Sequence, residues 1–322
     1  MPPLRALLLA AFAILTLTGC EALFDPAASR REARWLQEIP PLGDLIEVEG
    51  RQVHVLVTGR PRGSARDVVL IHGSNGNLRD FTFDLVPRLQ SGFRVIAVDR
   101  PGLGYSDTWG EIDSDPREQA RILQQALAQV GVTRPIVVGH SYGGAVAMGW
   151  ALNAPLETGA LVLISGATHP WDEDLSAWYR FNRTALAPTV RAALAAFAPE
   201  PAAHRAIADL FAPDPLPEGY VAHFGAGLSM RRSSQANNVR QVNDLLGYIT
   251  EMAPQYAQLT LPIEILQGAR DPVIAQETHG DRLIAQASGA RLTVIEDAGH
   301  MLHHTHPEAV IAAIRRAASR AR

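Results

Sequence analysis

The sequence contains no lysine, because all 29 of its basic residues are arginine. Without lysine the chain cannot form a Schiff base with a carbonyl substrate or with pyridoxal phosphate, and it has no phosphate-binding loop that ends in lysine. Cys20 is the only cysteine, so no internal disulfide can form. The net charge of −4 leaves no basic excess for binding nucleic acid.

The sequence also lacks cysteine and histidine residues at the spacing of a structural zinc site. Four histidines do gather near the C-terminus, at His300, His303, His304 and His306. No oxygen or sulfur ligand that would complete a metal site lies close to them in the sequence. We therefore expect His300 to be catalytic, the other three to be partly solvated, and the protein to hold neither a metal nor a cofactor.

What the chain does have is a pronounced motif at residues 139–144, which read Gly-His-Ser-Tyr-Gly-Gly. The motif follows the apolar run 135–138 and precedes a helix-compatible stretch, an arrangement typical of a nucleophile elbow. Such a turn is so tight that only glycine fits at positions 139 and 143. Ser141 would then lie in a strained conformation at a helix N-terminus, where backbone N–H groups favour developing negative charge.

A serine hydroxyl is a weak nucleophile and needs a base, which in turn needs an orienting group. After a nucleophile elbow these partners follow along the chain as an acid and then a histidine. Asp271 comes just after the predicted strand 262–267, and His300 comes just after the predicted strand 290–296. We therefore predict that His300 is the base and Asp271 its orienter, with the acidic run 172–174 as the alternative source of the acid.

Acyl transfer also needs hydrogen-bond donors for the oxyanion of the tetrahedral intermediate. One predicted donor is the backbone N–H of Tyr142, the residue after the nucleophile. The second is expected in the loop after the predicted strand 67–71, where Gly73 and Gly76 allow close approach of the backbone to a ligand. The N–H of Ser74 is the best candidate there.

Taken together, these features resemble the α/β-hydrolase superfamily, in the group whose members carry a helical cap. The resemblance covers roughly residues 45–317 and depends on four stretches: His72-Gly73, residues 99–106, residues 139–144, and the loops of Asp271 and His300. It implies an α/β fold with a mostly parallel eight-stranded sheet and helices on both faces. In the family pattern the stretch that begins at Asp99 shapes a loop, so we interpret Asp99 as structural.

The alternation of strand and helix patterns agrees with this fold class. Strands are expected near 45–49, 52–57, 67–71, 93–98, 135–139, 160–165, 262–267 and 290–296. Helices are expected near 78–90, 115–130, 142–153, 277–288 and 307–319.

Almost a hundred residues separate the predicted strand at 160–165 from the next one, far more than a usual connection of about 2–6 residues. This segment has helical patterning, best at 185–198 and 239–252, and it lies where caps are inserted over a site. We therefore expect a helical cap at 168–261, and a core formed by 45–167 and 262–322.

The N-terminus has a different character. Residues 6–17 form an apolar run that is too short to span a bilayer but fits the core of a signal peptide. Leu17-Thr18-Gly19-Cys20 then resembles a bacterial lipobox. The resemblance implies a signal peptide at 1–19, lipid on Cys20, a tether at 20–44, and a protein anchored to a membrane of the bacterial cell envelope.

These predictions describe a serine hydrolase that forms an acyl-enzyme from a small, partly apolar substrate. A carboxylic ester is the expected substrate, with a thioester, lactone, amide or C–C bond as alternatives. Epoxide hydrolases and haloalkane dehalogenases, which resemble this group, use an aspartate nucleophile, and position 141 is serine. The alternative from another functional class is a catalytically silent protein of the same fold that binds a ligand or partner.

Overall fold

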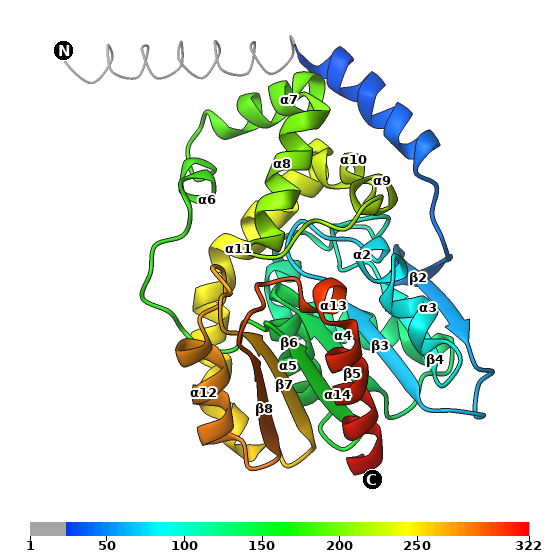
Figure 1. The fold of residues 1–322 in the computed structure, drawn as a ribbon. Helices are drawn as coiled ribbons and strands as arrows, with labels where there is room; N and C mark the ends of the chain where they lie inside the picture. The colour runs from blue at the N-terminus through cyan, green and yellow to red at the C-terminus, as the bar shows by residue number, and fades with distance from the viewer. Residues whose placement is uncertain (1–23, 322) are drawn as a thin grey trace, which may run out of the picture.

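The structure, a computed structural model, describes residues 24–321 and is built on one eight-stranded sheet (Figure 1). The strand order is β1-β2-β4-β3-β5-β6-β7-β8. The strands are β1 (Asp44–Val48), β2 (Arg51–Gly59), β3 (Asp67–Ile71), β4 (Arg94–Val98), β5 (Ile136–His140), β6 (Ala160–Ile164), β7 (Ile263–Gly268) and β8 (Ala290–Ile295). The predicted eight-stranded sheet is confirmed.

Strand β2 runs antiparallel to both of its neighbours, β1 and β4, and the remaining strand pairs are parallel. Every residue of β3, β4, β5 and β6 is buried. These strands are rich in valine, isoleucine and leucine because helices cover the sheet on both faces. Parallel strands end at one edge of the sheet, so the loops after them meet there.

Helices lie in two layers (Figure 1). One apolar cluster joins the sheet to α4 (Pro116–Gln129), α5 (Tyr142–Asn153) and α12 (Gln276–Gln286). A second cluster joins the opposite face to α2 (Arg79–Thr82), α3 (Leu85–Leu89) and α14 (Pro307–Arg320). Two short helices complete this part of the chain: η1 (Gly110–Ser114) and α13 (Leu302–Thr305).

The helix expected at 78–90 is divided into α2 and α3. Pro87 explains the break, because proline has no N–H and its ring would clash with the carbonyl of Phe83 in a continuous helix. Asp84 leaves the helical conformation, with φ −139°, and α3 begins after it.

The segment between β6 and β7, the cap (residues 168–261), lies over the carboxyl edge of the sheet (Figure 1). Its helices are α6 (Ala177–Phe181), α7 (Ala187–Phe197), α8 (Glu200–Phe211), α9 (Tyr220–Phe224), α10 (Ala226–Met230), α11 (Arg232–Met252) and η2 (Ala253–Gln258). The patterns at 185–198 and 239–252 correspond to α7 and to the last two thirds of α11. The sequence prediction did not place α6, α8, α9, α10, η2 or the first third of α11.

A helix over residues 24–38 occupies much of the segment predicted as a tether, and it packs against the cap. Arg31 donates to the carbonyl of Ala198 at 2.6 Å, and Arg232 pairs with Glu32 at 3.1 Å. Trp35 is buried.

The predicted signal peptide and Cys20 lie outside the described residues. Within residues 24–321, no helix has both the length and the apolar character needed to cross a membrane.

Candidate active site

Ser141 follows the last residue of β5 and caps the N-terminus of α5, with φ 54° and ψ −120°. A positive φ is rare for a residue with a side chain and stores strain at functional sites. The flanking glycines make the turn possible. A Cβ at Gly139 would lie 2.2 Å from the carbonyl oxygen of Gly143, and a Cβ at Gly143 would lie 2.2 Å from that of Ile71.

His300 and Asp271 come together from the loops after β8 and β7. The Nδ1–H of His300 donates to Oδ2 of Asp271 at 2.8 Å, and both side chains are buried. This hydrogen bond leaves Nε2 of His300 as the nitrogen that can accept a proton. The alternative acidic run 172–174 is exposed, and Asp174 pairs with Arg180 instead.

The carboxylate of Asp271 is held by its own loop. Its Oδ1 accepts the backbone N–H groups of Val273 and Ile274 at 2.8 and 3.0 Å. Burial raises the pKa of Asp271, but the hydrogen bond from His300 and these backbone donors outweigh burial and lower the pKa below its usual value. Asp271 is therefore ionised at neutral pH, as an orienting group must be.

Ser141 and His300 line one cavity of about 440 Å³ under the cap. The loop after β3 forms its polar wall, and the side formed by the cap is almost entirely apolar. The apolar lining residues are Trp178, Leu194, Ala198, Ala202, Ala203, Ala206, Ile207, Leu210, Phe224, Ala226, Met230, Val273 and Met301. No arginine is among the described residues that line this cavity.

The two predicted oxyanion donors lie beside Ser141. Tyr142 is the first residue of α5, and Ser74 lines the cavity in the loop after β3. Within residues 24–321, no carbonyl or side chain accepts from the backbone N–H of Ser74 or Tyr142. Both donors are therefore available to a ligand.

The loop that carries Ser74 is fastened to the cap. The N–H of Asn75 donates to Oδ1 of Asn238 at 2.6 Å, and the carbonyl of Asn75 accepts from the hydroxyl of Ser229 at 2.5 Å. Asn77 donates to the carbonyl of Phe224 at 3.1 Å. The cap thus helps to set the position of a predicted oxyanion donor. These contacts could not be predicted from local patterns, because the partners are more than 140 residues apart.

Arg100 also supports the loop of Ser74, a role that was not predicted from the sequence. It is fully buried, donates to the carbonyl oxygens of His72 and Gly73, and lies over the ring of Tyr142 at 4.1 Å. Burial lowers the pKa of Arg100 to about 10, so the guanidinium remains charged at neutral pH. Asp99 accepts the backbone N–H groups of Leu78 and Tyr105, which agrees with the structural role predicted for it.

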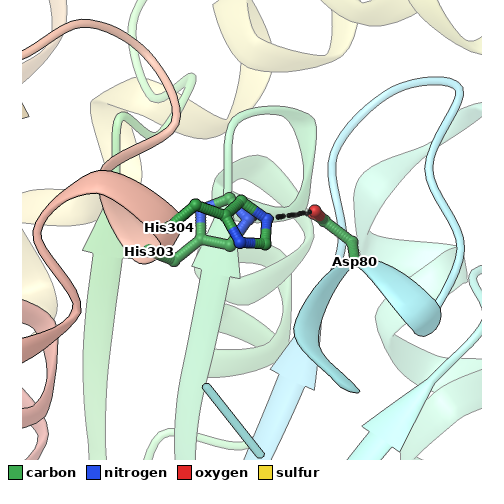
Figure 2. A group of neighbouring side chains, drawn as sticks. All are labelled: Asp80, His303 and His304. Atoms are coloured by element: carbon green, nitrogen blue, oxygen red, sulfur yellow. Dashed lines mark hydrogen bonds and ion pairs between the residues drawn. The ribbon is translucent and has the colours of Figure 1, made fainter. Parts of the chain in front are cut away.

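The expectation for two of the C-terminal histidines is wrong. His303 and His304 are buried rather than partly solvated, and an oxygen ligand, Asp80, does lie beside them (Figure 2). Asp80 comes from α2, which is why no sequence neighbour indicated it. Burial raises the pKa of Asp80, but the two histidines outweigh burial and hold the pKa well below its usual range.

Comparison with known proteins agrees with this architecture. Residues 68–307 match the family described as alpha/beta hydrolase fold. A curated relative, the 2-hydroxy-6-oxononadienedioate/2-hydroxy-6-oxononatrienedioate hydrolase of Escherichia coli O139:H28, is 27% identical over 274 residues, which are 82% of this chain and 90% of the relative.

Two solved structures share the fold. An esterase from Exiguobacterium antarcticum has a TM-score of 0.67 at 20% identity, over 86% of this chain and 99% of the esterase. An enol-lactonase from Burkholderia xenovorans LB400 has a TM-score of 0.64 at 18% identity, over 86% of this chain and all of the lactonase. The chain belongs to the α/β hydrolase fold family and is a hydrolase.

Proposed function

We propose that the protein is a serine hydrolase that cleaves a carboxylic ester with an apolar acyl group. The observation that carries the proposal is the placement of Ser141 and His300 on the wall of one cavity, with His300 held by Asp271. In this proposal Ser141 is the nucleophile, His300 the general base and Asp271 the group that fixes the tautomer of His300.

The reaction proceeds in two halves. Oγ of Ser141 attacks the ester carbonyl carbon while Nε2 of His300 takes its proton, and the carbonyl oxygen becomes an oxyanion that accepts from the N–H groups of Ser74 and Tyr142. The C–O bond to the alcohol then breaks, and His300 returns the proton to the departing alcohol. Water then attacks the acyl carbon while His300 takes its proton. The bond to Oγ of Ser141 breaks, His300 returns the proton to Oγ, and the carboxylic acid leaves.

The lining of the cavity favours a neutral, apolar acyl group. Its cap side offers apolar side chains, and no arginine lines it among the residues that the structure describes. The curated relative is named for hydrolysis of a dioate, a substrate with two carboxylates. Within residues 24–321 no arginine lines the cavity to pair with a dianion, so we favour an ester over that substrate.

The nearest alternative is hydrolysis of a C–C bond, a lactone or an amide by the same three residues. The names of the curated relative and of the enol-lactonase support this alternative. A catalytically silent binding protein is the alternative from another class. A serine in a strained elbow that shares a cavity wall with the histidine of a histidine–aspartate pair argues against it.

A panel of p-nitrophenyl esters of graded acyl length tests the proposal. Turnover is expected to rise from acetate to a medium chain, and Ser141→Ala is expected to abolish both turnover and labelling by a fluorophosphonate probe. Turnover retained by Ser141→Ala, or labelling at another serine, would overturn the assignment. Activity on a dienedioate without activity on any ester would select the C–C alternative.

We also propose that the protein is lipid-anchored through Cys20 in the bacterial cell envelope. The support is the sequence Leu17-Thr18-Gly19-Cys20 after a short apolar run. Several acyl chains on one residue would give stable anchoring. Mass spectrometry is expected to find modified Cys20 as the first residue in the membrane fraction. An intact Met1 on protein free in the cytoplasm would show that Cys20 is not an anchor.

A further inference from the structure

Asp80, His303 and His304 form a compact buried group beside the proposed active site (Figure 2). His303 Nε2 lies 3.1 Å from Oδ2 of Asp80, and His304 Nε2 lies 2.8 Å from Oδ1. One ligand atom from each residue lies within 4.8 Å of the other two. A zinc ion with bonds of about 2.0–2.1 Å holds its ligands about 3.3 Å apart, so small shifts would admit an ion between these atoms.

The carboxylate of Asp80 is buried, and its partners among the described residues are histidine and tyrosine side chains. The Oδ atoms of Asp80 accept from His303, His304 and Tyr220, and among the described residues no arginine contacts them. A buried carboxylate is normally paired with a cation or bound to a metal. A metal ion among these side chains would supply a full positive charge, and the two imidazoles beside the carboxylate are groups that can bind one.

His140 is a further, independent sign of a missing ligand. It is 3% exposed, and its Nδ1 has no hydrogen-bond partner among the described residues, yet this atom lies 3.9 Å from Oδ2 of Asp80. The Nε2–H of His140 donates to the carbonyl of His300 at 3.2 Å. That bond fixes the tautomer in which Nδ1 carries a free lone pair, the state in which histidine binds a metal.

We infer that Asp80, His303 and His304 bind a divalent transition metal of the Zn²⁺ type. Two imidazole nitrogens and a carboxylate oxygen are ligands that zinc prefers. The hydroxyl of Tyr220 holds the carboxylate at 2.6 Å, and Nδ1 of His140 is near enough to approach the remaining position. Asp80 and His140 line the cavity, which gives the ion a path of entry.

Binding would change the tautomer of both histidines. Each neutral imidazole would move its proton from Nε2, where it now faces Asp80, to Nδ1, so that Nε2 offers a lone pair to the ion. The ion would join α2, which follows the loop of Ser74, to α13, which follows His300. Its expected role is therefore to stabilise this edge of the molecule, and the role does not depend on the proposed ester hydrolysis.

The test is a titration of the untagged full-length protein in detergent, stripped with a chelator, first with Co²⁺ and then with Zn²⁺. One equivalent of Co²⁺ is expected to give the visible absorption bands of a low-symmetry site with nitrogen and oxygen ligands. Zn²⁺ is expected to displace it and to raise Tm. His303→Gln and Asp80→Asn are expected to lose the bands and the Tm shift.

His306→Gln is the matched control, because His306 lies near the same helix but does not contact Asp80. It is expected to bind one equivalent as the wild type does. X-ray absorption of the zinc-loaded wild type covers the case in which a variant does not fold, and two imidazoles per zinc are expected. Absence of one-equivalent binding, loss of binding in His306→Gln, or a sulfur ligand would overturn the inference.

Discussion

Two histidine–aspartate groups lie at the same edge of the sheet, and they differ in what holds the carboxylate. Asp271 is fixed by two backbone N–H groups of its own loop and accepts from a single histidine. Asp80 accepts from two histidines and a tyrosine, all through side chains. The first arrangement fixes one imidazole tautomer for proton transfer. The second brings two imidazoles and a carboxylate close enough together for the proposed metal site.

The largest expected effect is on activity, and it distinguishes the Asp271–His300 pair from the group of Asp80. Asp271→Asn is expected to lower kcat/KM by about 10⁴, because the amide no longer selects the tautomer in which Nε2 of His300 accepts a proton. Ester turnover measured beside a thermal unfolding curve checks this, and Tm is expected to change little. If Asp271→Asn is nearly silent while Asp172→Asn or Asp174→Asn is inactive, the orienting acid lies on the cap side.

The second prediction concerns stability, to which Asp80 is expected to contribute more than Asp271. Asp80→Asn is expected to lower the free energy of unfolding by about 3 kcal/mol, since it removes a buried charged acceptor from three donors. Urea unfolding of the metal-free protein at pH 7 checks the value. A loss as small as that of Asp271→Asn would show that the two carboxylates contribute equally to stability.

A third prediction concerns buried histidines that have no carboxylate partner. Burial, aided by nearby cationic groups, lowers the pKa of His72 and of His279 to about 4. The unfolded chain binds more protons between pH 6.5 and 4, so stability is full above pH 6.5 and is lost as the pH falls toward 4. Each histidine is expected to account for about 3 kcal/mol of that loss.

His279→Gln tests this effect without touching the proposed catalytic residues. Nδ1 of His279 accepts backbone N–H groups of Thr168 and His169, and a glutamine carbonyl can accept in its place. Urea unfolding at pH 7 and pH 4.5 is expected to show a smaller acid loss in the variant. An equal loss in both proteins would mean that His279 is not the source.

The smallest expected effect concerns the contact between the cap and the loop of Ser74. Asn238→Ala removes the acceptor for the N–H of Asn75 and is expected to lower kcat about tenfold with little change in KM. Loss of a whole oxyanion donor costs about 10²–10³, and a displaced loop should cost less. Asn243→Ala, on the same helix, is the control, because Asn243 donates to the backbone carbonyl of Tyr179 and makes no hydrogen bond to the loop of Ser74. Equal effects of the two variants on kcat would show that the bond between Asn75 and Asn238 does not position the Ser74 donor.

The sequence could predict the sheet and the placement of Ser141, since both depend on local patterns. Buried parallel strands are continuous apolar runs, and a nucleophile elbow is a short motif with glycines that the structure shows to be sterically required. The loops of Asp271 and His300 could be found because each directly follows such a strand.

Contacts across the chain could not be predicted in this way. Asp80 lies 223 and 224 residues from its histidine partners, and Asn75 lies 163 residues from Asn238. An aspartate in a short helix and an asparagine in a long one have no distinctive local pattern. The closely spaced His303 and His304 were the one visible signal, and the sequence could not show which distant oxygen they would meet.

The hydrogen bonds between the loop after β3 and the cap residues Asn238, Ser229 and Phe224 have a consequence for protein engineering. Exchange of caps between related enzymes is an obvious way to change which molecules they accept. In this protein a transplanted cap would bring a new binding surface but would leave the loop of Ser74 without its supports. A functional chimera would have to carry residues 73–77 together with the cap, as a single cassette.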